Sequence, residues 1–354
     1  MQWRWPHFRS WRFALFYGLF LVVTVGAGVE IAVRLMHRAP PLNQQFPGMV
    51  PDPYLPYRPA PNGVWIGPSA SGEFSFEARH SSLGLRDVEH SAKKPPGSFR
   101  ILGLGDSFTY GTGAAFEDTY LVRLEGLLNQ RPGAHPKTEI IKAGIPRYFP
   151  EPERLFLEHY GLAFEPDLVI VTFTPNDVID THMGLDAVKP SEDGFLMTRE
   201  ASELGGLGHW LFVHSHAARM ALAKWVAHRI WTRDPIFWND VYVANGHHEK
   251  SWEKVEEEYR RMADLAGSRG ARLVIVQIPE HGPWDKPEFS YPAARLSAWA
   301  AANDAFFIDT LPALAAASSS EKLYWDTDPH CNAAGYRVVA EAVNQGLSEH
   351  GLVP

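Results

Sequence analysis

The sequence predicts an α/β protein: a parallel sheet of about five strands with helices on both faces, preceded by an N-terminal transmembrane helix. Three observations predict this fold class. From about residue 99 onward, short apolar runs alternate with helix-length segments, which is typical of strand–helix–strand units. The runs are almost continuously apolar, as expected for parallel strands buried on both faces. Residues 13–33 form a long apolar segment close to the N-terminus.

The segment 13–33 (FALFYGLFLVVTVGAGVEIAV) is apolar apart from Thr24 and Glu30. About 20 apolar residues suffice for a helix to cross a bilayer. A cleaved signal peptide would instead use Val-Gly-Ala at 25–27 as its small-residue cleavage site. Apolar residues continue beyond that site, which favours an uncleaved anchor in contact with the lipid bilayer. Arginines and tryptophans flank the segment, as at a membrane interface: Trp3, Arg4, Trp5, Arg9, Trp11, Arg12, Arg34 and Arg38.

The arginine distribution predicts the topology of this anchor. Three arginines precede the apolar segment and two follow it. Positive charge favours the cytoplasmic side of a membrane. We therefore expect a short cytoplasmic tail and a single-pass anchor within residues 1–38, with the rest of the chain on the periplasmic or extracytoplasmic side.

Residues 39–98 are expected to form a linker and a short β preamble. Eight prolines fall between Pro40 and Pro61, which excludes a helix or a central strand and indicates an extended spacer. Residues 73–77 alternate like a short strand, with Phe74 and Phe76 on one face. The run KKPPG at 93–97 marks the end of this part.

Residues 99–354 are expected to form the main domain. An insertion at about 182–249 interrupts its alternation; it is rich in tryptophan and histidine and has helical spacing over 209–230. A long insertion of this kind is either a lid or substrate wall, or a packed helical hairpin without substrate contact. Strands are expected over 100–105, 139–143, 168–173, 272–278 and 305–308. Helices are expected over 117–130, 152–162, 252–266, 295–303 and 333–347.

Composition excludes several classes of protein. The net charge is -8, and no Lys/Arg run occurs beyond the extreme N-terminus, so a nucleic-acid partner is not expected. One cysteine, Cys331, allows no intrachain disulfide. The histidines lack metal-site spacing, and the glycines of 103–113 lack a following Gly-Lys-Ser/Thr. We expect neither a metal nor a cofactor.

Polar residues gather in four segments, three of which directly follow predicted strands: 105–108, 144–148, 174–177 and 326–330. In open parallel sheets, ligands bind beyond the carboxyl ends of the strands. These segments contain a serine, a histidine, carboxylates and an asparagine. A serine hydroxyl needs an adjacent base, which histidine supplies near neutral pH. A carboxylate orients that histidine, and amide donors stabilise an oxyanion.

Each of these residues also has an ordinary structural explanation. Ser107 is a plausible helix N-cap, Asn176 and Asp177 a plain turn, and His330 a helix-start residue. Their joint occurrence at one edge of one sheet favours the catalytic interpretation.

The motifs resemble those of the SGNH, or GDSL, hydrolases. Gly-Asp-Ser-Phe at 105–108 resembles the first block of that family, Thr-Pro-Asn-Asp at 174–177 the third, and Asp-Pro-His-Cys-Asn-Ala-Ala-Gly at 328–335 the last. The resemblance covers roughly residues 98–350. It implies a flavodoxin-like, three-layer α/β/α fold and a serine esterase or acyltransferase, and membrane-proximal members often begin with an anchor.

The resemblance also implies roles for individual residues. Ser107 would be the nucleophile, His330 the general base and Asp328 its orienting carboxylate. Many members place that carboxylate three residues before the histidine, where this chain has Thr327, flanked by Asp326 and Asp328. The resemblance to the Asp-x-His variant of the family makes Asp328 the first choice, with Asp326 as the reserve.

Four groups are candidates for the oxyanion hole. The resemblance implies the side chain of Asn176 and the backbone N–H of Ser107. The second block of the family commonly provides a glycine; Arg147 stands at that position here, with Gly144 three residues earlier. An arginine at that place has a side chain that would point toward the pocket or its rim.

Three functions remain open at this point. The first is hydrolysis of O-acyl, especially acetyl, esters of carbohydrate or lipid at the cell envelope. The second is an O-acyltransferase that modifies a surface polysaccharide beside the envelope polysaccharide machinery, with the insertion excluding water. The third is a non-catalytic assembly or binding subunit that keeps the fold.

Overall fold

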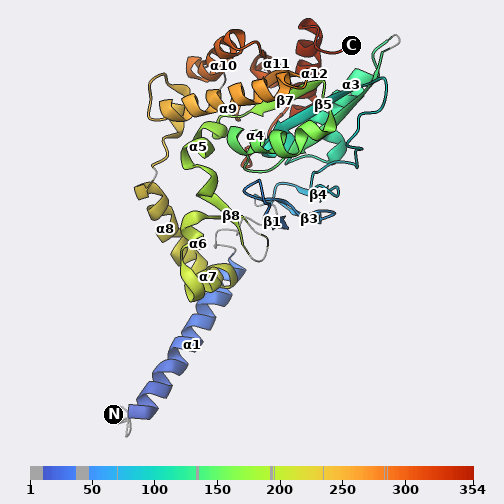
Figure 1. Cartoon of the computed structure of the whole chain (residues 1–354). Coiled ribbons are helices and arrows are strands. Elements are labelled where there is room, and N and C mark those ends of the chain that lie inside the picture. The colour runs from blue at the N-terminus through green and yellow to red at the C-terminus, as the bar shows by residue number, and fades with distance from the viewer. Residues whose placement is uncertain are drawn as a thin grey trace. The chain divides into compact units, whose positions relative to one another are not determined.

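The computed structural model describes residues 11–36, 48–69, 71–132, 135–191, 194, 196–233, 235–282, 284 and 286–354 (Figure 1). The chain divides into two compact units, Met1–Leu42 with Arg199–Pro235, and Asn43–Thr198 with Ile236–Pro354. Several residues used to predict the membrane topology and the spacer lie outside the described residues: Trp3, Arg4, Trp5, Arg9, Arg38 and Pro40.

The larger unit is built on a five-stranded sheet whose neighbouring strands are all parallel, in the order β11-β10-β7-β5-β6. Every strand predicted for this sheet is confirmed to within two residues at either end. The strands are β5 (Ser98–Gly105), β6 (Lys137–Gly144), β7 (Leu168–Phe173), β10 (Arg272–Gln277) and β11 (Phe306–Asp309).

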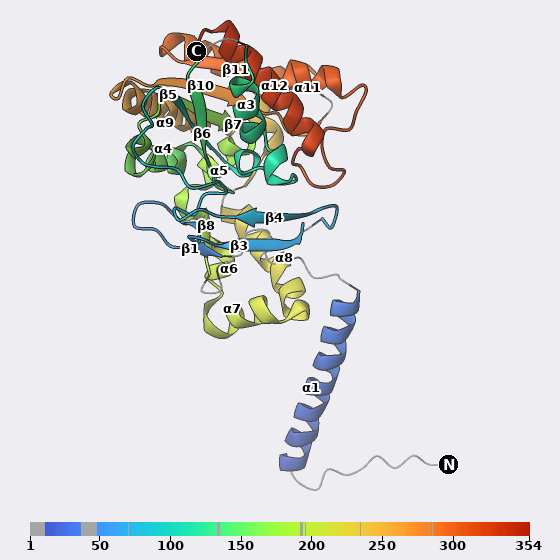
Figure 2. The ribbon, with the colours of Figure 1, turned by 90° about the vertical axis from the view of Figure 1, so that its right-hand side faces the viewer.

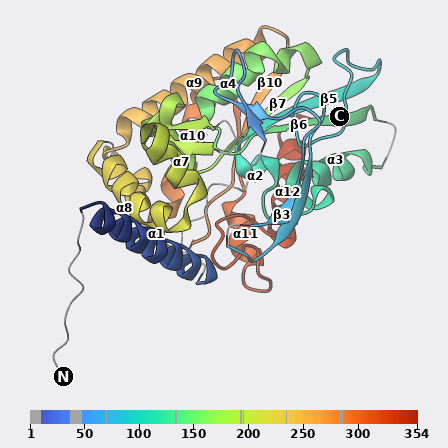
Figure 3. The ribbon, with the colours of Figure 1, turned by 90° about the horizontal axis from the view of Figure 1, so that it is seen from below.

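Alternate strand residues enter two separate cores, one on each face of the sheet. Leu102 and Val169 pack on one face, and Ile101 and Ile170 on the other. Figure 3 shows α4 and α9 on one side of the strands and α3 and α12 on the other. The predicted three-layer α/β/α fold is therefore confirmed. One face carries α4 (Pro150–His159), α5 (Asn176–Met183), α9 (Glu249–Gly267) and α10 (Tyr291–Ala302); the other carries α3 (Tyr120–Asn129), α11 (Leu311–Ala317) and α12 (Ala333–Glu349).

The proline-rich preamble differs from the extended spacer that was expected. Met49, Leu55 and Tyr57 are buried and join the core on the α4 side of the sheet. The prolines limit the strands to short pieces, but the apolar residues between them still gain from burial. β1 (Met49–Val50) pairs with β2 (Arg58–Pro59), and β3 (Val64–Pro68) forms a hairpin with β4 (Ser75–Arg79), shown in Figure 2.

The described residues of the smaller unit form four helices: α1 (Trp11–Leu35), α6 (Arg199–Ser202), α7 (Gly205–His214) and α8 (His216–Arg233). The continuous helical spacing predicted over 209–230 is broken at Ser215. The predicted insertion is divided between the units, because residues on either side of 199–235, including β8 (Val188–Pro190) and β9 (Leu196–Thr198), belong to the larger one. α1 is long and apolar enough to cross a membrane, a property shared by membrane anchors and signal sequences.

Candidate active site

The serine-containing turn follows directly from the end of β5. Gly105 has a φ of 152°, and a Cβ there would lie 2.1 Å from Thr109 Oγ1, so a side chain at this position would clash. The Asp106 carboxylate accepts a hydrogen bond of 2.8 Å from the Phe108 N–H and caps the short helix α2 (Ser107–Tyr110). Ser107 thus begins a helix at the carboxyl end of a central strand.

The structure brings Ser107, His330 and Asp328 together although the serine and the histidine are 223 residues apart in the chain. Ser107 Oγ lies 2.7 Å from His330 Nε2, and His330 Nδ1 lies 2.5 Å from Asp328 Oδ1. Because an ionised carboxylate only accepts, the Nδ1–H donates to Asp328 and Nε2 is left to accept the hydroxyl proton. The serine is partly exposed, whereas the histidine and aspartate are buried. In this arrangement the histidine is placed to accept the proton of the serine hydroxyl.

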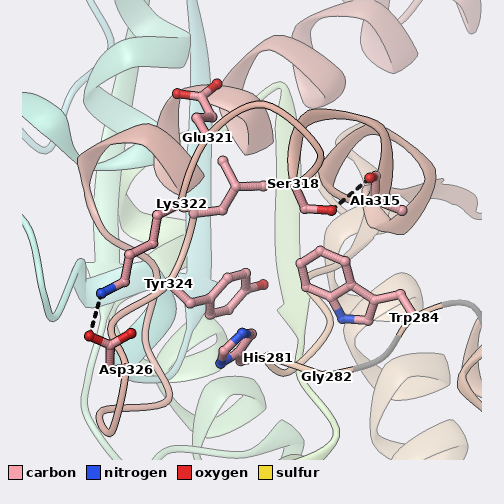
Figure 4. A pocket seen from close by; sticks show the side chains of 10 residues that line it. His281, Gly282, Trp284, Ala315, Ser318, Glu321, Lys322, Tyr324 and Asp326 are labelled. Carbon is pink, nitrogen blue, oxygen red and sulfur yellow. Dashed lines mark hydrogen bonds and ion pairs between the residues drawn. The ribbon is translucent and has the colours of Figure 1, made fainter.

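The reserve carboxylate, Asp326, is exposed and forms an ion pair of 2.7 Å with Lys322 Nζ, whereas the carboxylate bonded to His330 is that of Asp328. Figure 4 shows this pair at the edge of a cavity of about 540 Å³ that is also lined by His281, Trp284 and Tyr324. Ser107 and His330 are not among the described residues that line this cavity, so it is separate from the serine.

The Asn176 side chain lies at the same edge of the sheet, at the start of α5. Its Nδ2 donates to Asp106 Oδ2 at 3.1 Å and makes a longer contact of 3.4 Å with Asp180 Oδ2. Its Oδ1 accepts from Thr174 Oγ1 at 2.5 Å, which fixes the orientation of the amide. The N–H engaged in the longer, weaker contact is the one that an oxyanion would take.

Arg147 adopts a backbone conformation that favours glycine. Its φ is 66°, in the left-handed region. The chain therefore keeps the backbone shape of a glycine at this position while adding a guanidinium group. Arg147 Nη2 donates to Asp180 Oδ1 at 2.8 Å, and the Asp180 carboxylate raises the pKa of Arg147. The side chain is thus held in an ion pair with α5.

Gly144 is explained by close packing. It is the last residue of β6 and pairs with Gly105, and a Cβ there would lie 2.2 Å from the backbone nitrogen of Tyr110. A larger residue would push β6 away from α2. Participation of the Gly144 and Arg147 N–H groups in an oxyanion hole stays a prediction.

Glu73, which sequence reasoning missed, supports the loop before the histidine. One oxygen of its carboxylate accepts from the Asp326 N–H at 2.7 Å. The other accepts from the Thr327 N–H at 3.0 Å, the Thr327 hydroxyl at 2.6 Å and the Asp328 N–H at 2.8 Å. The Thr327 hydroxyl and then these backbone N–H groups hold the pKa of Glu73 at about 2. A single carboxylate therefore fixes the segment that places Asp328 beside His330.

Two further preamble residues support the other loops. The buried Arg86 guanidinium donates to the carbonyls of Tyr110 at 3.1 Å and Gly111 at 2.8 Å, which follow the serine. The Tyr57 hydroxyl donates to the Pro146 carbonyl at 2.9 Å, beside Arg147. No motif marks these residues in the sequence, because their partners are set by the tertiary fold.

Replacing Glu73 with glutamine is expected to lower kcat by about tenfold, since small displacements of catalytic groups are costly. The amide carries no charge and offers one acceptor oxygen in place of two, so the loop bearing Asp328 loses part of its support. Steady-state kinetics on a short-chain ester measure the effect, with KM expected to change little.

Glu77→Gln is the matched control, because Glu77 lies in the same hairpin and pairs with the exposed Arg79. Wild-type kcat in Glu73→Gln, or an equal loss in Glu77→Gln, would show that Glu73 does not position the loop.

A buried carboxyl group, that of Glu153, lies in α4. Glu153 is 1% exposed, and neither of its carboxyl oxygens has a hydrogen-bond partner among the residues that the structure describes. Burial, and after it the charge of Asp106, raises the pKa of Glu153 well above its usual value. Burial likewise raises the pKa of Asp177, whose Oδ2 accepts from the Thr174 N–H. The unionised form of Glu153 is the one suited to the folded state.

Glu153→Gln is expected to weaken the dependence of stability on pH. Because the folded-state pKa is raised, the folded protein retains a proton that the unfolded chain loses near its ordinary value of about 4.3. The contribution of protonated Glu153 to the free energy of unfolding is therefore fully present below about 4.3. It is lost as pH rises from there toward the folded-state pKa. Thermal unfolding in detergent at pH 5 and pH 8 tests this. An unchanged difference between the two midpoints in the variant would contradict it.

A family model and several solved structures are similar to this chain. The sequence model of the GDSL-like lipase/acylhydrolase family matches residues 104–338, well over half of the chain. Similar solved structures include a catalytic mutant of Axe2, an acetylxylan esterase from Geobacillus stearothermophilus (15% identity, 71% of this chain and 95% of that chain covered, TM-score 0.44). This chain is also similar to TesA (14% identity, 71% of this chain and 98% of that chain covered, TM-score 0.43). A third similar structure is a putative lipolytic protein of the G-D-S-L family from Desulfitobacterium hafniense DCB-2 (13% identity, 71% of this chain and 100% of that chain covered, TM-score 0.42). No curated protein sequence matches the chain.

The family match includes the serine turn, the Asn176 segment and the loop of Asp328 and His330. The three short motifs that resembled this family in the sequence therefore lie within a match that extends over most of the sheet. The chain belongs to the GDSL-like lipase/acylhydrolase family of serine ester hydrolases.

Proposed function

We propose that this protein hydrolyses O-acyl esters, particularly acetyl esters, of carbohydrate or lipid at the cell envelope through an acyl-enzyme on Ser107. The observation that supports the proposal is the hydrogen-bonded series from Ser107 Oγ through His330 to Asp328, with distances of 2.7 and 2.5 Å. These three side chains are within proton-transfer reach of one another without any rearrangement.

In the first half of the reaction, Ser107 Oγ attacks the ester carbonyl carbon while His330 Nε2 accepts the hydroxyl proton. Asp328 stabilises the resulting imidazolium. The backbone N–H of Ser107 and the Nδ2 of Asn176 donate to the oxyanion, with the N–H groups of Arg147 and Gly144 as further candidates. The intermediate collapses when the carbon–oxygen bond to the alcohol breaks, and His330 gives its proton to the departing alcohol.

In the second half, water attacks the acyl-enzyme. His330 accepts a proton from the water as its oxygen bonds to the acyl carbon. The bond to Ser107 Oγ then breaks, the proton returns to the serine, and the carboxylic acid is released. No metal or cofactor takes part in this scheme.

The envelope location in the proposal depends on α1. In the proposal residues 13–33 form the anchor, and the chain after about residue 38 lies on the periplasmic or extracytoplasmic side. The site would then be held close to surface glycans and lipids. In this proposal residues 1–38 are the anchor and residues 99–354 the catalytic domain. The linker, 39–98, contributes Glu73 and Arg86 to the loops of the site.

The test combines active-site labelling with a product assay on the full chain in detergent. A fluorophosphonate probe is expected to label Ser107, and acetylated sugars are expected to release acetate. Failure of both would contradict the proposal and favour a non-catalytic binding subunit. Acetyl groups recovered on an added acceptor glycan, with little free acetate, would identify an O-acyltransferase instead.

A further inference from the structure

Helix α7 is apolar on all sides, yet it has no buried side. Its sequence is GGLGHWLFVH, and none of its ten residues, all of which the structure describes, is buried. Leu207 is 73% exposed and Trp210 is 54% exposed. A helix that is hydrophobic all round normally lies in a protein core or in lipid. Ten residues give about 15 Å of helix, half the hydrocarbon thickness of a bilayer, so α7 is too short to cross one.

The end of α7 is joined to α1 through Glu30, the one acidic residue in the apolar segment 13–33. Glu30 Oε2 accepts from Ser215 Oγ at 2.8 Å and the Ala217 N–H at 2.9 Å, while Oε1 accepts from the His216 N–H at 2.9 Å. The carboxylate thereby caps the N-terminus of α8, where the helix dipole favours negative charge. The α7–α8 junction is therefore fixed against α1.

Arg34, one turn further along α1, completes this contact. Its Nε lies 2.6 Å from Glu30 Oε1, and its Nη2 donates to the His214 carbonyl at the end of α7 at 3.0 Å. Charged side chains in membrane segments are tolerated near the ends of the helix, where they reach the interface. Glu30 and Arg34 both lie in the last six residues of α1, so the junction is at the level where α1 would leave the hydrocarbon. Figure 1 shows α7 beside that end of α1.

Helix α8 has the composition of an interfacial helix. It contains four basic residues and no acidic residue between His216 and Arg233. Lys224 is exposed, whereas Arg219 is buried and Arg229 and Arg233 form ion pairs with Glu203. Trp225 and Trp231 are exposed, and the Arg229 guanidinium lies 5.3 Å from the centre of the Trp225 ring. Tryptophan and basic residues are enriched where helices meet lipid headgroups, and basic helices are attracted to anionic lipids.

We propose that α7 and α8 lie on the bilayer surface at the C-terminal end of α1, with the apolar side chains of α7 inserted at the boundary of headgroups and acyl chains. In this proposal the segment 199–235 is a membrane-contact element. This inference rests on the proposed membrane anchoring through α1 but is independent of the chemistry at Ser107.

Site-directed fluorescence tests the proposal, because the single native cysteine, Cys331, is fully buried and an introduced thiol can be labelled alone. Leu207→Cys and Trp210→Cys place an NBD fluorophore at two positions on α7. Leu19→Cys, within α1, reports the anchor, and Val88→Cys, exposed in the larger unit, reports bulk water. Each full-length variant is reconstituted in vesicles of phosphatidylcholine and phosphatidylglycerol with nitroxide-labelled lipids.

The label at 207 or 210 is expected to have blue-shifted emission and to be quenched more strongly by nitroxides near the headgroup than by nitroxides deep in the acyl chains. The label at 19 should be quenched more strongly by the deep nitroxides than by those near the headgroup. The label at 88 should be quenched by neither kind of nitroxide. If both α7 labels behave like the label at 88 while the label at 19 is quenched, the interfacial proposal is wrong and the anchor stands. If the label at 19 is also unquenched, the anchor is wrong as well. Esterase activity, measured in the same vesicles, tests the proposed reaction separately.

Discussion

Replacing Ser107 with alanine is expected to abolish acyl-enzyme formation and to lower ester hydrolysis by at least roughly 10⁴-fold. The alanine removes the oxygen that lies 2.7 Å from His330 Nε2, so the histidine has no nucleophile to deprotonate. The oxyanion donors and the fold stay in place, so weak activity above the uncatalysed rate should remain. The first turnover on a chromogenic acetate ester and labelling by a fluorophosphonate are the two measurements.

Ser319→Ala is the matched control, because Ser319 is an exposed serine whose hydroxyl donates to the Ala316 carbonyl in its own turn. It should retain full activity and full labelling of Ser107. If the Ser107→Ala variant kept the wild-type rate of the first turnover and the wild-type extent of labelling, the nucleophile would be another residue. The proposed mechanism would then be wrong.

Asp328→Asn is expected to lower kcat by roughly 10³–10⁴-fold, the effect typical of losing the orienting carboxylate of a serine triad. Asp328 Oδ1 accepts from both Nδ1–H and the backbone N–H of His330, at 2.5 and 3.1 Å. An asparagine can present its NH₂ group toward the ring and stabilise the tautomer with the proton on Nε2, which cannot accept from Ser107. It also cannot stabilise the imidazolium by charge. Steady-state kinetics of the purified variant measure the loss.

Asp326→Asn provides the comparison that separates the two candidate carboxylates. Its side chain forms an exposed ion pair with Lys322, which is worth little, so kcat should stay within about twofold of wild type. Its backbone N–H, which donates to Glu73, is unaffected by the substitution. A large loss in Asp326→Asn together with a small one in Asp328→Asn would reverse the assignment.

The central sheet could be predicted because its strands are short, apolar on both faces and separated by segments of helical length. The serine, asparagine and histidine segments were recognisable because each is a short motif at a strand or helix boundary. The choice between Asp328 and Asp326 could not be made from spacing alone, because both carboxylates flank Thr327. It depends on which residue of the loop turns toward His330, and that is set by the hydrogen bonds to Glu73.

The preamble and the smaller unit show why the rest could not be predicted. Glu73 and Thr327 are 254 residues apart, and the partner of Arg147 is a carboxylate one turn beyond the Asn176 position. Such pairs are specified by packing, not by local sequence. The helix break at Ser215 did have a local signal, because serine is a common N-cap residue. In the structure the Ser215 hydroxyl accepts from the Ala218 N–H, as an N-cap serine does. The second cap from Glu30 is a tertiary contact and left no such signal.

The contact between Glu30 and α8 would make the proposed anchor specific to this protein. A helix that only tethers a domain can be exchanged for any apolar segment of suitable length. α1 supplies the acceptors for three donors at the start of another helix. A chimera with a foreign transmembrane segment would leave these donors without their carboxylate, even if it were inserted in the correct orientation.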